Sequence, residues 1–342
     1  FLVHFLIIIV MSPSYSNEPD SINFDFVDKY ALQSPKTQAE TVEKLTKYLV
    51  TPYENDILKA RSIYVWIVNN ISYDHKMAND ITKKPETIQS ILKTKNAICG
   101  GYSELFKKMA ELAGIRAVYI AGYSRHHSFR EKKPFSWSSH AWNAIEVGGV
   151  WYLLDSTWER EIYSKLGKSI GKTYFLKTPK EFILDHLPED PMWQLLYHPI
   201  TLQEYKKSLE NVKELLLRED TCYHYLDSIN SINKLAPPEA RLKTAMNAFI
   251  FNPSNHLAIG MGMLEFGNII SRNNAKSRKT NINYRILKQK EALNYFKASL
   301  SHLNKDGNQV FIESCRSNIK YSNRFISNLN KKKKKLSKNK KH

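Results

Sequence analysis

The chain has 342 residues, of which 42% are hydrophobic and 12% aromatic, and its formal net charge is +18. This length and composition exclude an intrinsically disordered protein and leave room for two domains, or for one domain with a large extension. Three cysteines exclude a disulfide framework, and their odd number leaves at least one thiol free.

The first residues form an apolar run over 1–11, too short to span a bilayer but as long as the hydrophobic part of a signal peptide. Small residues follow it and provide a cleavage site: Ser12, Ser14 and Ser16. We therefore expect residues 1–16 to be a signal segment and the protein to be exported, to a periplasm or by secretion. A buried N-terminal strand is the alternative interpretation. Residues 17–54 are predicted to form an N-terminal arm, with helical spacing over 38–49.

Two helices are predicted next from apolar residues at three- and four-residue spacing. The first covers residues 56–70, with Asp56 at its N-cap, and the second begins at Cys99 and ends before Gly114. Residues 116–123 are predicted to be a strand, followed by a basic, aromatic loop over 124–139. Strands over 140–147 and 150–155 are separated by two glycines, a pattern typical of a two-residue hairpin turn.

The hairpin predicts a contact between His140 and Asp155. If Gly148 and Gly149 are the two turn residues, the numbers of directly paired residues sum to 297. His140 and Asp155 are then diagonal neighbours on one face of the hairpin, about 5–8 Å apart, within reach of an imidazole–carboxylate hydrogen bond. A slip of one residue would put them on opposite faces.

Cys99 completes a nucleophilic triad with these two residues. It lies at the predicted N-terminus of a helix, where backbone N–H groups and the macrodipole stabilise a thiolate. Gly100 and Gly101 leave space for a substrate backbone beside the sulfur. In this interpretation His140 is the base and Asp155 orients it. Taken alone, Cys99 is a weak signal, because a small buried core residue is the commonest fate of a free cysteine.

Other histidines offer weaker alternatives. His126 and His127 are rival bases, but no carboxylate is placed beside them, and we expect them to be solvated or at the rim of a cleft. Cys99, His126, His127 and His140 follow no usual zinc-ligand spacing, and the chain has no Cys-x-x-Cys pair. We therefore predict neither a metal nor a cofactor.

The C-terminal half, residues 200–330, is predicted to be mainly helical, from the spacing over 202–217, 222–235 and 286–303. A strand-rich accessory domain is the alternative for 237–270. Residues 331–342 contain eight lysines and no acid, and we predict a disordered tail. Such a tail favours weak contact with polyanions or a membrane surface. Without arginines or aromatics it does not indicate specific nucleic-acid binding.

Several motifs, taken together and in order, resemble the transglutaminase-like superfamily. They are residues 66–74 (WIVNNISYD), 97–103 (AICGGYS), 140–143 (HAWN) and 151–158 (WYLLDSTW). Residues 174–176 and 188–196 are similar to the kyphoscoliosis-peptidase-like branch. The resemblance implies an α+β, papain-like catalytic domain over 55–199, in which a Cys-bearing helix packs on an antiparallel sheet. It places nucleophile, base and orienting acid at Cys99, His140 and Asp155.

The expected function is therefore that of a cysteine hydrolase acting on peptide or isopeptide amide bonds of a protein or peptide substrate, through a thioester on Cys99. Water or a lysine amine can resolve the same thioester, so a cross-linking protein-glutamine acyltransferase is an alternative. A non-catalytic binding or scaffold module with this fold is another alternative, and thiol reactivity discriminates it from an enzyme.

Overall fold

The computed structural model describes residues 22–78, 86–125, 135–167, 170–218, 222–277 and 281–339. Within these residues the chain forms two compact units. One comprises the chain up to residue 120 together with 141–182, and the other comprises 121–140 together with 183 onward. None of the described helices is long and apolar enough to cross a bilayer.

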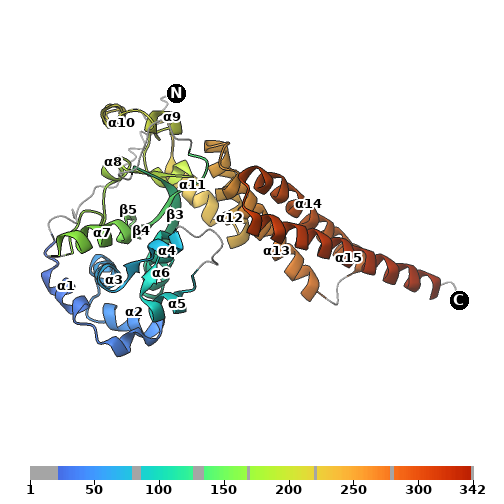
Figure 1. Cartoon of the computed structure of the whole chain (residues 1–342), viewed down its shortest axis with the longest axis horizontal. Coiled ribbons are helices and arrows are strands. Elements are labelled where there is room, and N and C mark those ends of the chain that lie inside the picture. Colours follow the sequence, from blue (N-terminus) through green and yellow to red (C-terminus); the bar gives the residue numbers. More distant parts are fainter. Residues whose placement is uncertain are drawn as a thin grey trace, which may run out of the picture. The chain divides into compact units, whose positions relative to one another are not determined.

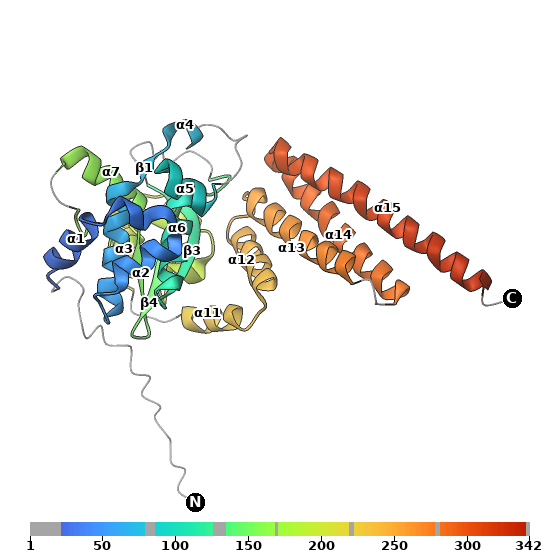
Figure 2. The same ribbon diagram turned by 90° about the horizontal axis from the view of Figure 1, so that it is seen from below.

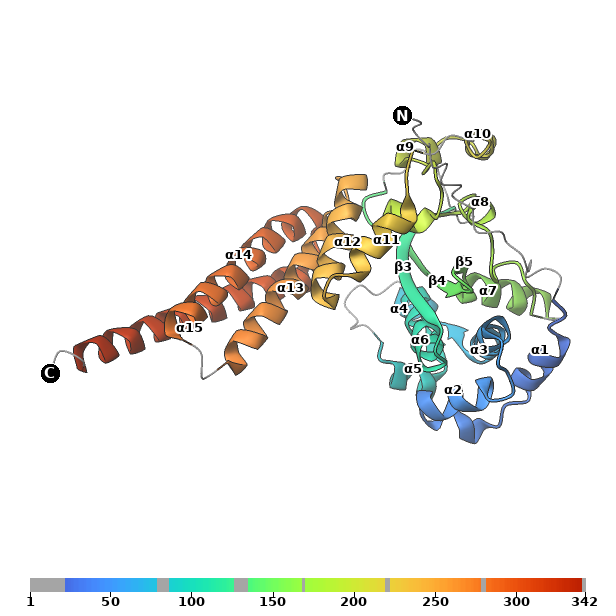
Figure 3. The same cartoon turned by 180° about the vertical axis from the view of Figure 1, so that it is seen from behind.

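In the first unit, one buried helix is surrounded by other helices (Figure 3). This helix, α3 (Asp56–Asn70), is buried on all sides over residues 60–68, so the single apolar face expected from the sequence understates its burial. Its N-cap is Asn55, whose side chain accepts hydrogen bonds from the backbone N–H of Ile57 (2.8 Å) and Leu58 (3.3 Å). The predicted cap, Asp56, is the first helical residue instead. The surrounding helices are α1 (Asp25–Leu32), α2 (Val42–Val50), α6 (Cys99–Leu112) and α7 (Ser156–Leu166). Helix α5 (Ile88–Thr94) packs on α6 and α2.

The segment before residue 55 is part of this core, not a separate arm. Leu45 and Leu49 of α2 are fully buried in the same apolar cluster as α3. The buried Ser62 hydroxyl of α3 donates to the Leu49 carbonyl (2.8 Å). The predicted boundary at 54/55 is therefore wrong, because the apolar face of α2 is covered by α3 and cannot be left in water.

The main sheet has four strands in the order β5-β4-β3-β6. They are β3 (Arg116–Ser124), β4 (His140–Val147), β5 (Val150–Leu154) and β6 (His186–Pro188). Strands β4 and β5 pair antiparallel from Val147↔Val150 to Asn143↔Leu154, so the predicted register is confirmed. Both turn residues, Gly148 (φ 59°) and Gly149 (φ 80°), have the left-handed backbone that this turn requires.

Helix α6 packs on this sheet, as the predicted fold requires. Leu105 and Phe106 of α6 share one apolar cluster with Ile145 of β4 and Leu154 of β5. A second, two-residue parallel pair joins β1 (Ser72–Tyr73) to β2 (Asn96–Ala97) immediately before α6. Short elements complete the first unit: η2 (Lys36–Glu40), α4 (His75–Ala78) and α8 (Pro179–Phe182).

The second unit is mainly helical beyond β6, as predicted. The long helices α13 (His256–Lys276), α14 (Ile282–Asp306) and α15 (Gln309–Asn339) lie side by side (Figures 1 and 2). The other elements are η3 (Pro191–Gln194), α9 (Leu202–Tyr205), α10 (Leu209–Leu215), α11 (Tyr225–Asn233) and α12 (Pro237–Phe251).

The strand-rich alternative for 237–270 is excluded, and the expected disorder from residue 331 is wrong. Residues 237–270 are helical rather than strand-rich. Glycine is a poor helix former, so the glycines of α13 weaken the helical pattern in the sequence. In the structure they leave space for side chains of the neighbouring helix α14. An added Cβ at Gly260 would lie 2.7 Å from Leu303, and one at Gly267 would lie 2.7 Å from Phe296. Helix α15 also continues through the lysine run to Asn339, where disorder was expected from residue 331. Lysine is a good helix former, and extending an existing helix needs no new nucleus.

Candidate active site

Cys99 is the first residue of α6 and is half-buried. The turn that precedes it is fixed by Glu86, whose carboxylate accepts a hydrogen bond from the backbone N–H of Ile98 (3.1 Å). Gly101 is closely enclosed, since an added Cβ would lie 2.6 Å from Glu86 Oε2 and 2.9 Å from Ala97 Cβ. The helix N-terminus that carries the thiol is therefore held in one position by close packing.

Asp155 follows β5 directly and is the N-cap of α7. Its Oδ1 accepts hydrogen bonds from the backbone N–H groups of Thr157 (2.8 Å) and Trp158 (3.1 Å), and the residue is 1% exposed. The sequence placed it as the last residue of the strand, one position too far. The cap fixes the orientation of the carboxylate, and the helix N-terminus stabilises its negative charge.

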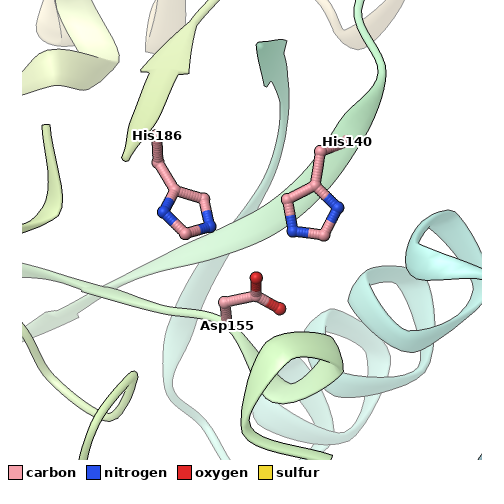
Figure 4. A group of neighbouring side chains, drawn as sticks. All are labelled: His140, Asp155 and His186. Atoms are coloured by element: carbon pink, nitrogen blue, oxygen red, sulfur yellow. The ribbon is translucent and has the colours of Figure 1, made fainter. Parts of the chain in front are cut away.

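His140 opens β4 and is buried. The strand pairing itself ends at Asn143↔Leu154, one pair before Asp155, which leaves β5 to cap α7. The structure brings these two side chains together, with the imidazole pointing toward the carboxylate (Figure 4).

Asn143 connects the strand of His140 to the helix of Cys99. Its side-chain amide donates to the Ser103 carbonyl of α6 (3.0 Å) and to the Val118 carbonyl of β3 (3.1 Å), and it is 1% exposed. Asn143 therefore links β4 to both α6 and β3.

His186 of β6 is a neighbour that sequence reasoning missed. One nitrogen or oxygen atom from each of His140, Asp155 and His186 lies within 4.8 Å of the others, and all three residues are buried (Figure 4). The His186 Nδ1 is hydrogen-bonded to Asp185, and the imidazole rings of His186 and His140 lie 5.4 Å apart. Two imidazoles and a carboxylate this close are a donor set able to hold a zinc ion. Because 31 residues separate His186 from Asp155, no local spacing in the sequence indicates this set.

Tyr73 of β1 packs against the apolar core of the first unit. It is only partly buried, and it lies close enough to Cys99 to interact with it electrostatically. Burial, followed by the charges of Cys99 and Asp155, raises the pKa of Tyr73 to about 12. Its phenol therefore keeps its proton at neutral pH and is a hydrogen-bond donor. The rival bases His126 and His127 lie outside the described residues.

Comparison with known proteins supports the expected family. A model of the transglutaminase-like superfamily matches residues 43–156. Human kyphoscoliosis peptidase is 33% identical over 200 residues, covering 57% of this chain and 30% of that protein. Hillarin of Drosophila melanogaster is 32% identical over 216 residues, covering 58% of this chain and 26% of hillarin. The resemblance drawn from the motifs is therefore confirmed, although the chain spans less than a third of the length of either relative.

The alignment with a crystal structure of a TGase covers 42% of this chain and 35% of the TGase chain, with 15% identity and a TM-score of 0.26.

The relatives correct one expectation, that of export. Kyphoscoliosis peptidase and hillarin are intracellular proteins, and the expected signal segment, 1–16, lies outside the described residues. A short apolar run at the start of a sequence was insufficient grounds for that expectation.

Proposed function

Because residues 43–156 belong to the transglutaminase-like superfamily, we propose that this protein is a cysteine-nucleophile hydrolase of peptide or isopeptide amide bonds. The observation that carries the proposal is that a side-chain donor atom of His140 lies within 4.8 Å of one of Asp155, and both residues are buried. A third residue, Cys99, supplies the nucleophile from a helix N-terminus.

In the first step the Cys99 sulfur attacks the carbonyl carbon of the scissile amide, and His140 holds the proton that the thiol gives up. Asp155 fixes the tautomer and orientation of the imidazole and stabilises its cationic form. As the carbon–nitrogen bond breaks, His140 transfers that proton to the leaving amine. A water molecule, deprotonated by His140, then attacks the thioester, releases the carboxylic acid and restores the thiol.

Each tetrahedral intermediate carries a negative charge on the former carbonyl oxygen. The backbone N–H of Cys99 at the start of α6 is one donor to this oxyanion. We assign the second to the Tyr73 phenol, because the β1–β2 pair places Tyr73 opposite Ala97, two residues before Cys99. Replacing Tyr73 by Phe is expected to leave the thiol reactive and to slow turnover by about 10²–10³-fold, the usual cost of one oxyanion donor.

The test is the alkylation rate of Cys99 by iodoacetamide as a function of pH, measured peptide by peptide by mass spectrometry, in the wild type and in His140→Ala. A His-stabilised thiolate reacts well below pH 8.5, the ordinary thiol value, and the variant loses this reactivity. The exposed Cys222 serves as an internal control, because its rate should be the same in both proteins. An ordinary Cys99 thiol in both proteins would refute the catalytic proposal and favour a binding module.

Hydrolysis and acyl transfer are then separated by their products. A library of glutamine- and lysine-containing peptides is incubated with the enzyme, with and without a small primary amine. The proposal predicts new carboxylic acids in both cases. Products that appear only when the amine is present would identify an acyltransferase instead.

A further inference from the structure

A pair of histidines lies in the helical second unit, apart from the residues considered so far. His256 is the first residue of α13 and His302 lies near the end of α14. Their Nδ1 atoms are 3.0 Å apart, and the ring centroids are 5.2 Å apart. Both residues are partly exposed, so ions can reach them from solvent.

Packing on three sides holds this pair in place. One turn after His256, an added Cβ on Gly260 would lie 2.7 Å from Leu303, so the two helices are in close contact there. The Ser299 hydroxyl of α14 donates to the Gly260 carbonyl (2.6 Å). The ring of Phe249, from α12, lies 5.3 Å from the His256 ring and 5.0 Å from the His302 ring. The two imidazoles therefore have little freedom to separate.

A carboxylate is available on the same side. Asp306 follows His302 by four residues on α14, so the two side chains lie on one helix face, one turn apart. The Asp306 oxygens are not within 4.8 Å of both Nδ1 atoms, so its side chain has to turn toward the pair to reach a shared ion. The nearby charge that opposes a cation is the exposed Lys305.

We propose that His256, His302 and Asp306 bind a divalent transition-metal ion, with zinc as the best match. Zinc lies about 2.0–2.1 Å from imidazole nitrogens, and tetrahedral geometry separates two such nitrogens by about 3.3 Å. The observed 3.0 Å therefore needs to widen by only about 0.3 Å. Two imidazoles and one carboxylate leave the fourth position to water.

Zinc binding requires one proton of the histidine pair to move. Without metal, one Nδ1 donates its hydrogen to the other, so the rings are opposite tautomers. Zinc takes the place of that hydrogen, which moves through solvent to the Nε2 of the same ring. The ion then links the start of α13 to the end of α14 and stabilises the pair of helices. None of these three residues takes part in the proposed catalysis.

The experiment titrates the full-length protein with Co²⁺, whose visible absorption reports its ligands, and then displaces the cobalt with Zn²⁺. Zinc should also raise the urea midpoint of the wild type. His256→Ala and His302→Ala should each weaken binding by at least about 100-fold, and Asp306→Asn by at least about tenfold. Two control variants remove possible ligands elsewhere in the protein and should bind the metal as the wild type does. They are His186→Gln, in the His140 group, and Cys222→Ser, an exposed thiol. Circular dichroism confirms that each variant is folded.

If a variant fails to fold, the ligands are identified in the wild-type protein instead. X-ray absorption of the zinc-loaded protein should show two imidazole nitrogens at about 2.0 Å and no sulfur. Zinc binding that is lost in His186→Gln but retained in His256→Ala would overturn the proposal and place the ion at the His140 set. The absence of binding at millimolar zinc, or sulfur in the absorption spectrum, would overturn it equally.

Discussion

Asp155 has two roles that substitution can separate, because it caps α7 and also lies beside His140. Asparagine at this position keeps an oxygen for the N–H groups of Thr157 and Trp158 but removes the negative charge. Alanine removes both. The two variants therefore differ in whether the cap survives, and share the loss of the charge beside His140.

The expected magnitudes follow from the observed contacts. Losing an N-cap costs about 1 kcal/mol, and an N–H left unsatisfied in a buried position costs about 1–3 kcal/mol. Thr157 is 5% exposed, so its N–H has little access to water. Asp155→Ala should therefore reduce the free energy of unfolding by about 2 kcal/mol. Asp155→Asn should reduce it by less than about 0.5 kcal/mol, because asparagine is an equally good cap.

Urea unfolding followed by circular dichroism measures these differences, and alkylation of Cys99 measures the effect on the thiol. Both variants should lose the low-pH thiol reactivity of the wild type. Once a substrate is found, Asp155→Asn should lower kcat by about 10⁴-fold, as expected for a wrongly oriented imidazole. Equal stability losses in the two variants would refute the capping argument. An unchanged thiol profile in Asp155→Asn would refute the orienting role.

Other predictions concern packing and charge. Gly101→Ala should destabilise the protein by about 1–3 kcal/mol in urea unfolding, because the new methyl group meets Ala97 and Glu86. Gly100→Ala is the matched control in the same helix. Its new methyl group has only a 3.6 Å contact, so this variant should be equally stable or more stable than the wild type. Arg61→Met should lower the free energy of unfolding by about 3–5 kcal/mol, since Arg61 is 1% exposed and its guanidinium donates two hydrogen bonds to Asp28. Adding Asp28→Asn should recover part of this loss. Fully additive losses in the double variant would contradict the pairing of the two residues. Burial raises the pKa of Glu189, so the folded protein holds the proton of this carboxyl group more tightly than the unfolded chain does. The free energy of unfolding should therefore fall as the pH rises from the pKa of Glu189 in the unfolded chain through its pKa in the folded protein. Glu189→Gln should therefore flatten stability against pH in urea titrations from pH 4 to 8, whereas an unchanged slope would show that another group is responsible.

Local sequence was sufficient for the parts of the site that depend on a few neighbouring residues. Two glycines with left-handed backbone set the hairpin register, which is observed as far as Asn143↔Leu154. The expected proximity of His140 and Asp155 agrees with the structure. The start of α6 at Cys99 likewise followed from the apolar spacing after it. These features depend on backbone geometry over short distances, where few alternatives compete.

Tertiary packing decided what spacing could not. His186 reaches the His140–Asp155 pair from a strand far along the chain, and His256 meets His302 only because two helices cross closely at Gly260. The same applies to α2, whose apolar spacing was visible in the sequence but whose packing against α3 was not. The sequence by itself therefore determined the hairpin and the start of the Cys99 helix. Which distant side chains join them depended on how the elements pack, because burial of apolar surface is non-directional and leaves no local signature.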